Sequence, residues 1–273
     1  HSDYPLVEAF DFKRSSLTNF LEAPARLMKT SFDQDKLKVM HNNIKSSSIY
    51  DEKLKMYKTS GCIDNESHEI GRIHAFTKGW LERESNFLHM TYKYLLGLLK
   101  AGLYEEYYEE IETNLVCNMD PAVYKRSTLE NSSFLATSNN PDSSIHGKGF
   151  FARLSGSTVE TLNMWAVMMT GGKPFSYKDK KLRFELKPKL SSKFFKKDKT
   201  ISFNLLKKIK ITYINDSLED TFKRCDIYKI ELIKNGEVTT MNQPYLEGQT
   251  ALDIRDGLYE TINIYINKNK EEN

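Results

Sequence analysis

The sequence has little cysteine and little net charge. Its three cysteines, Cys62, Cys117 and Cys225, lie far apart and form no CxxC motif or Cys/His cluster, so we expect no metal site. Reduced thiols of this kind are typical of a cytoplasmic protein. The 40 Lys and Arg residues nearly balance the 37 Asp and Glu residues. This balance gives no electrostatic basis for binding nucleic acid.

Long apolar runs are also absent. No stretch approaches the about 20 apolar residues that span a bilayer, so we expect no membrane partner. The first residues, His-Ser-Asp-Tyr-Pro-Leu, contain neither the basic nor the apolar region of a signal peptide. They also lack an initiator Met, which suggests a chain that begins inside a longer protein.

What the sequence does have is aromatic side chains and helical periodicity. Aromatic residues make up 12% of the chain, which argues against disorder. Up to about residue 172, apolar residues recur at helical spacing. Pro24 is expected to kink or end the first of these helices, and glycines follow two others. The predicted helices are 15–29, 33–44, 87–101, 103–112 and 158–170.

After Pro174 the apolar period changes to two, which is typical of strands. Alternation is clearest in KLRFELKP and IKITYI, and Asn235-Gly236 is a hairpin-turn signal. We therefore predict two domains, with a mainly helical part over 1–172 and an antiparallel β domain over 173–273.

A run of basic residues lies at the start of this β part. Between positions 181 and 210, eleven Lys and Arg side chains against Glu185 and Asp198 give a local charge of +9. The run could form an anion-binding face. It could also be a solvated sheet face whose lysines deter edge pairing. The alternation places many of these lysines outward, which favours the second interpretation.

The segment 69–89 gathers residues that could bind a sugar. Trp80 could stack on a sugar ring, and Glu82 and Glu84 could accept hydrogen bonds from hydroxyls, with Arg83 between them. His89 follows in an otherwise apolar helix. The alternatives are a solvated helix start for the acids and a buried core histidine for His89.

The segment 146–158 gathers residues that could bind an anion. Ser155, Gly156 and Ser157 immediately precede the helix predicted at 158–170. Backbone N–H groups at a helix start bind anions, and glycine allows close approach. An ordinary N-cap is an equally good interpretation. The long connection 117–157 is expected to be an ordered, functional loop.

These segments together resemble a known family. The residues Glu69-Ile-Gly-Arg-Ile-His-Ala-Phe, the stretch ERESNFLHMTYKYLLGLLKAGLYEE and the turn Leu154-Ser-Gly-Ser-Thr carry the resemblance. They resemble the C-terminal part of inverting glycoside phosphorylases of the cellobiose phosphorylase type. These are the family 94 enzymes and the related β-oligoglucan phosphorylases of families 149 and 161. The resemblance covers roughly positions 5–175.

The resemblance implies a fold and a phosphate site. This chain would supply the last helices of an (α/α)6 toroid, followed by a small antiparallel β domain. His89 falls where the family has a phosphate-binding histidine. Ser155 and Gly156 fall where the family has a Thr-Gly pair on phosphate, and Ser157 completes that turn. Inorganic phosphate would be a co-substrate, and no cofactor is implied.

The resemblance also implies where the sugar lies. Glu82 falls on a family glutamate near the acceptor sugar, close to Trp80. Arg83 and Glu84 replace small residues of the disaccharide enzymes, which changes the expected acceptor specificity. The family's general acid is an aspartate in an Asp-Trp-Asn-Asp-like motif. No such motif occurs here, so no catalytic residue is assigned to this chain and the acid is expected upstream.

The implied function is the phosphate-binding part of a glycosyltransferase-type phosphorylase in carbohydrate metabolism. It would release glucose 1-phosphate from β-linked glucosides or β-glucan oligosaccharides, and the isolated chain would be inactive. Its partners would be a β-linked gluco-oligosaccharide, phosphate, the upstream part of the enzyme and, as a homodimer, a second copy. One alternative is a non-catalytic carbohydrate-binding module that uses the β half. Another is a hydrolase or transglycosylase with a water-activating carboxylate.

Overall fold

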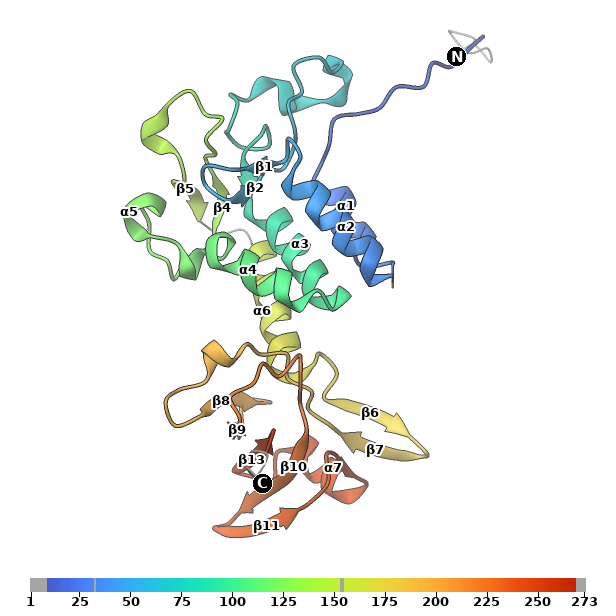
Figure 1. The fold of residues 1–273 in the computed structure, drawn as a ribbon, viewed down its shortest axis with the longest axis vertical. Coiled ribbons are helices and arrows are strands. Elements are labelled where there is room, and N and C mark those ends of the chain that lie inside the picture. Colours follow the sequence, from blue (N-terminus) through green and yellow to red (C-terminus); the bar gives the residue numbers. More distant parts are fainter. Residues whose placement is uncertain (1–8, 32, 153–154, 269–273) are drawn as a thin grey trace, which may run out of the picture.

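A computed structural model describes residues 9–31, 33–152 and 155–268, with only the backbone at residues 152 and 155. Helices dominate its upper part in Figure 1, and strands its lower part. No helix in the described residues is both long enough and apolar enough to cross a bilayer. The described α-helices are α1 (Glu22–Leu27), α2 (Gln34–Lys45), α3 (Leu88–Ala101), α4 (Tyr104–Asn114), α5 (Pro121–Tyr124), α6 (Ser155–Thr170) and α7 (Gln249–Asp256).

Helix α3 is the centre of the helical part. Most of its side chains are buried, because it packs against α1, α4 and α6. Gly97 allows the close approach of α1, since a Cβ there would lie 3.1 Å from Cβ of Met28. The helix ends at Gly102, whose φ of 81° is the left-handed conformation expected for that glycine.

Two small antiparallel sheets lie above these helices in Figure 1. One pairs β1 (Tyr50–Asp51) with β2 (Met56–Tyr57). The other has the order β3-β4-β5, in which β4 lies antiparallel to both neighbours. Its strands are β3 (Asn86–Phe87), β4 (Ser132–Leu135) and β5 (Gly149–Ala152). Because β3 leads directly into α3 and β5 leads toward α6, this sheet brings the starts of the two helices together.

Two further sheets make up the β part. One has the order β12-β7-β6 and the other β11-β10-β13-β9-β8, in which β13 runs parallel to β9. Asn235 and Gly236, with φ of 52° and 78°, form the predicted two-residue hairpin turn between β10 and β11. The strands are β6 (Phe175–Lys178), β7 (Lys181–Phe184), β8 (Thr200–Leu205), β9 (Ile209–Asn215), β10 (Ile227–Lys234), β11 (Glu237–Met241), β12 (Leu246–Glu247) and β13 (Thr261–Ile266).

The predicted fold class is wrong. The described residues do not form the last helices of a toroid followed by a small antiparallel β domain. Residues 46–87 and 115–152 form short strands, turns and single-turn helices such as α5 instead of long paired helices, and the largest sheet contains a parallel pair. The toroid was implied by a resemblance that rests on short motifs. Apolar periodicity could not test it, because periodicity identifies the buried face of a segment but not the element against which it packs.

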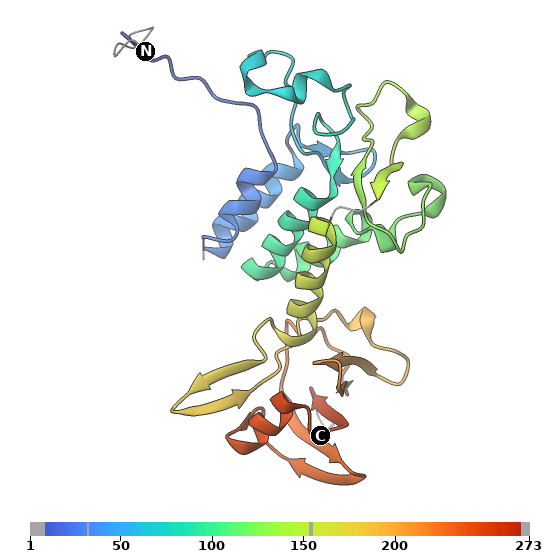
Figure 2. The ribbon, with the colours of Figure 1, turned by 180° about the vertical axis from the view of Figure 1, so that it is seen from behind.

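Helix α6 connects the helical part to the β part, as Figure 2 shows from behind. At the junction, the fully buried Tyr213 of β9 donates a hydrogen bond of 2.6 Å to the carbonyl of Met169 in the last turn of α6. This bond ties the end of the helix to the five-stranded sheet.

We expect Tyr213→Phe to lower the free energy of unfolding by about 1–3 kcal/mol, because it leaves a buried carbonyl unpaired. Urea unfolding would measure the loss. The matched control is Tyr177→Phe, since the Tyr177 side chain is 75% exposed and should lose almost nothing. Equal unfolding midpoints for the two variants would contradict the prediction.

Candidate functional site

The β3-β4-β5 sheet places His89 against the start of α6. His89 is the second residue of α3, and Gly156 is the second residue of α6. A Cβ added to Gly156 would lie 2.5 Å from Nδ1 of His89 and 2.6 Å from its Cε1. The imidazole therefore occupies the space that any side chain at position 156 would need. The structure brings together two of the residues predicted to bind phosphate.

The structure describes the other two residues of the first turn of α6, Ser155 and Ser157, only in part. The side chain of Ser155, whose hydroxyl is a predicted phosphate ligand, lies outside the described residues. Ser157 is fully buried, and its carbonyl accepts a hydrogen bond of 2.9 Å from Oγ1 of Thr161. The first N–H groups of a 16-residue helix such as α6 have no partner within the helix, and its dipole favours an anion at this end.

Charged side chains surround the imidazole. Burial lowers the pKa of His89 below its ordinary value of 6.5, and the charge of Lys93 lowers it further. Glu160 opposes both effects, with its Oε1 at 3.9 Å from Nε2 of His89, too far for a hydrogen bond. His89 is therefore neutral at neutral pH and can donate one N–H to a ligand while accepting at its other nitrogen.

Sequence reasoning missed the charged residues of this site. Lys93 lies one helical turn beyond His89 on α3, and Glu160 lies one turn beyond Gly156 on α6. Lys29, which follows α1, also acts on the His89 charge. The first two could have been found from the i, i+4 spacing, which places them on the same helix faces as the predicted ligands.

The predicted sugar-binding residues do not converge on one point. The Trp80 ring packs edge-on against Phe150, with 4.2 Å between ring centroids. Glu82 pairs with Arg72. Arg83 forms an ion pair with Asp64 at 2.6 Å. We infer that these side chains have structural partners, so that a sugar would have to compete with them.

Glu84 is the exception. Its side chain is 3% exposed, its Oε2 accepts a hydrogen bond from the amide of Asn139, and Oε1 has no hydrogen-bond partner among the described residues. Its φ of 54° is rare for a non-glycine residue, and such strain is frequent at functional sites. Of the predicted sugar ligands, Glu84 keeps a buried acceptor atom available.

Asp64 and Cys62 lie close to Glu84. Their ligand atoms and a Glu84 oxygen all lie within 4.8 Å of one another. Lys78 and Arg83 already bind Asp64, and these hydrogen bonds lower the pKa of the carboxyl to about 2. A metal ion would have to displace or face these two cations, so the cluster is better described as an ion-pair network.

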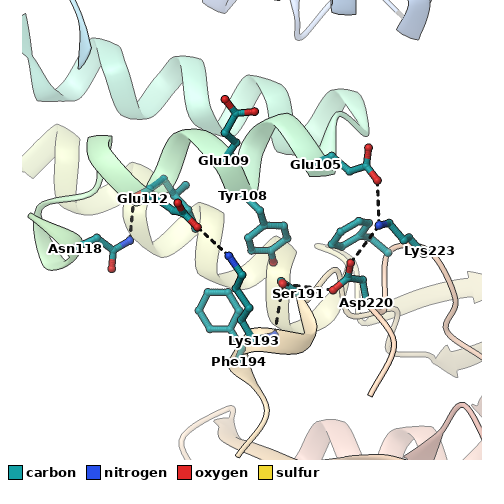
Figure 3. A pocket seen from close by; sticks show the side chains of 12 residues that line it. Glu105, Tyr108, Glu109, Glu112, Asn118, Ser191, Lys193, Phe194, Asp220 and Lys223 are labelled. Carbon is teal, nitrogen blue, oxygen red and sulfur yellow. Dashed lines mark hydrogen bonds and ion pairs between the residues drawn. The ribbon is translucent and has the colours of Figure 1, made fainter. Parts of the chain in front are cut away.

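A separate hollow lies between α4 and the β part (Figure 3). Its volume is about 440 Å³, and Tyr108, Phe194 and Phe222 line its interior. Two ion pairs cross it, Lys193–Glu112 at 2.9 Å and Lys223–Glu105 at 3.1 Å. Both of its lysines are thus paired across the seam between the two parts. It contains none of the predicted site residues.

No family model matches this chain, and no curated protein matches it. The contact between His89 and Gly156 is therefore the strongest support for a function.

Proposed function

We propose that this chain binds inorganic phosphate between the His89 ring and the first turn of α6, as the phosphate-binding part of an inverting glycoside phosphorylase. The substrates would be β-linked glucosides or oligoglucans. The observation that carries the proposal is the direct contact of the imidazole with Gly156. The resemblance of the same two positions to family phosphate ligands supports it.

The chemistry of inverting phosphorolysis fits this arrangement. An inverting hydrolase needs a carboxylate base to activate water. Phosphate is itself the nucleophile, so the protein needs donors and positive charge to hold a dianion. Here the N–H groups at the start of α6 and the His89 N–H would donate hydrogen bonds. Lys93 would supply positive charge, and Glu160 would favour proton uptake by the imidazole.

Phosphate binding predicts a change in the titration of His89. Without phosphate, its pKa lies below 6.5 because of burial and Lys93. A bound dianion adds negative charge beside the ring and stabilises the imidazolium, so the pKa should rise. NMR titration of the His89 ring signal in the full chain, with and without sodium phosphate at constant ionic strength, would measure this shift.

His89→Asn would assign the NMR signal, and its phosphate affinity should fall about ten- to a hundredfold, as for one lost charge-assisted contact. The matched control is His68→Asn, because His68 is exposed. Thermal unfolding would show that both variants fold. Unchanged phosphate binding by a folded His89→Asn variant would refute the proposal.

The alternative functions have less support in the geometry. A carbohydrate-binding β half needs several open aromatic rings. Tyr177 of β6 is 75% exposed, but Nζ of Lys229 lies 3.6 Å from the ring centroid of Tyr265 and covers one face of that ring. The Tyr265 hydroxyl is also bound, to Glu231 at 2.8 Å. A hydrolase would require a carboxylate to activate water, and its turnover would not depend on phosphate.

A further inference from the structure

We propose a second anion site, specific for a small diphosphate or bisphosphate, near the end of α6 that lies farthest from His89. Two neighbouring hollows lie there, with volumes of about 510 and 420 Å³. They share Lys100 and Tyr104 in their walls. Both volumes are within the range of small-molecule pockets, about 300–1,000 Å³. The second site could exist whether or not phosphate binds at His89.

The hollows carry positive charge only. Lys100, Lys173 and Lys189 line the larger one, Lys29 and Lys100 line the smaller one, and no acidic residue lines either. None of these four lysines forms an ion pair with any residue in the described ranges. By contrast, both lysines of the hollow in Figure 3 are paired.

Two of these lysines, Lys29 and Lys100, lie close enough to repel each other. Burial lowers the pKa of Lys29, and the charges of Lys100 and Lys93 lower it further, although Glu160 opposes them. Gathering like charges costs free energy, and at Lys29 the charge of Glu160 offsets part of that cost. A bound anion would offset this cost.

The helix ends do not explain the lysines. Helix C-termini attract cations because their last carbonyls lack partners. Here the carbonyls at the ends of α3 and α6 already accept hydrogen bonds from other donors. These bonds are Leu103 N to Leu98 O (3.0 Å), Gly102 N to Leu99 O (3.3 Å), Lys189 N to Met168 O (2.7 Å), Tyr213 Oη to Met169 O (2.6 Å) and Lys187 N to Thr170 O (3.2 Å).

The distribution of the lysines indicates two anionic groups on one ligand. Lys173 and Lys189 belong to one hollow and Lys29 to the other, while Lys100 is common to both. A ligand with a phosphoryl group in each hollow would have these four lysines in the walls around it. Ser31 and Asn163 add neutral hydrogen-bonding groups, one in each hollow.

The two proposed sites are well separated. Gly156 and Gly172, at opposite ends of α6, lie sixteen residues apart in sequence. At about 1.5 Å rise per residue, a helix of this length spans roughly 24 Å. Lys29 is the exception, because its charge also acts on His89. Variants of Lys100 and Lys173 should leave phosphate binding at His89 unchanged.

Calorimetric titration of the full chain with inorganic pyrophosphate, at constant ionic strength, tests the proposal. We expect saturable binding that Lys100→Met and Lys173→Met each weaken about tenfold, as for one lost charge-assisted contact. The matched control is Lys193→Met, whose lysine pairs with Glu112, and its affinity should be unchanged. Higher salt should weaken binding, and inorganic phosphate should bind less tightly than pyrophosphate.

Other outcomes would overturn the proposal. Equal weakening in the Lys193→Met variant would mean non-specific attraction to the surface. If His89→Asn abolishes pyrophosphate binding, the ligand lies at the start of α6 instead. If His89→Asn abolishes only the binding of inorganic phosphate, the result concerns the site at His89 alone. Affinity for single-stranded oligonucleotides that grows with their length would indicate a nucleic-acid surface. Absence of saturable pyrophosphate binding would refute the site.

Discussion

Lys45→Met is expected to lower the free energy of unfolding by about 3–5 kcal/mol, because it leaves a buried carboxylate without its counter-charge. Nζ of Lys45, on α2, lies 2.7 Å from Oε1 of Glu110 on α4. The Glu110 side chain is only 2% exposed. The contact is an ion pair rather than an aligned hydrogen bond. Urea unfolding at neutral pH would measure the loss.

No neighbouring cation can replace Lys45 at neutral pH. His41 is the nearest candidate, with Nε2 3.7 Å from Oε1 of Glu110. Burial and the charge of Lys45 lower the pKa of His41 to about 4, so its ring is neutral in the wild-type protein. Removing Lys45 takes away the second cause, but burial, the larger one, remains and still disfavours the charged ring. Its Nδ1 lies 2.8 Å from the hydroxyl of Tyr94, within the same buried cluster. Glu110 in the variant must therefore take up a proton or remain charged and unpaired.

The pH dependence follows from the sign of the Glu110 shift. Burial raises its folded-state pKa above 4.5, even with Lys45 present. A raised carboxyl pKa contributes stability that is complete below the unfolded pKa and is lost as pH rises through the folded one. Removing Lys45 raises the folded pKa further. The Lys45→Met deficit relative to wild type should therefore be larger at pH 8 than at pH 5.

Lys36→Met is the control for this prediction. Lys36 pairs with Asp33 at 2.9 Å, but its side chain is 84% exposed. Exposed pairs contribute about 0–1 kcal/mol, so this variant should unfold almost like wild type. If Lys45→Met and Lys36→Met unfold at the same urea concentration, Glu110 tolerates burial without a counter-charge and the prediction is wrong.

Local signals in the sequence predicted five helices, missed α5 and α7, and did not predict how the helices are arranged. Asp33 caps α2 by accepting a hydrogen bond from the N–H of Lys36, and Gly102 ends α3, because both features depend on neighbouring residues. The first helix was predicted from residue 15 but begins at Glu22, since Pro24 is tolerated only in a first turn. The toroid was wrong because short motifs that resemble a family do not specify how the helices pack.

In the candidate site, too, the features that depend on neighbouring residues were predictable and those that depend on distant residues were not. The histidine on α3 was predictable from the sequence, and so was a helix start after the 146–157 segment. That start was predicted at 158, whereas α6 begins at Ser155, so residues 155–157 form its first turn. Their contact depends on the pairing of β3 with β4 and of β4 with β5, between residues far apart in the chain. The ion pairs that occupy Glu82 and Arg83 depend on Arg72 and Asp64, which only the folded chain brings near.

Gly156→Ala should weaken phosphate binding about ten- to a hundredfold while leaving the fold intact. The new Cβ would lie 2.5–2.8 Å from Nδ1, Cε1 and Cγ of His89, so the ring has to move away from the start of α6. Alanine is about 1 kcal/mol better than glycine inside a helix, which offsets part of the strain in the fold. Calorimetry with phosphate and thermal unfolding would separate the two effects.

A double-mutant cycle with His89→Ala identifies the cause. If the methyl group acts by displacing the imidazole, adding Gly156→Ala to His89→Ala should weaken phosphate binding no further, because there is no ring left to displace. The matched control is Gly97→Ala, which presses on Met28, the residue after α1, and not on His89. Additive losses in the double mutant would mean that the methyl group blocks phosphate directly. In that case Gly156 would be a contact residue for the anion rather than the support for the His89 ring.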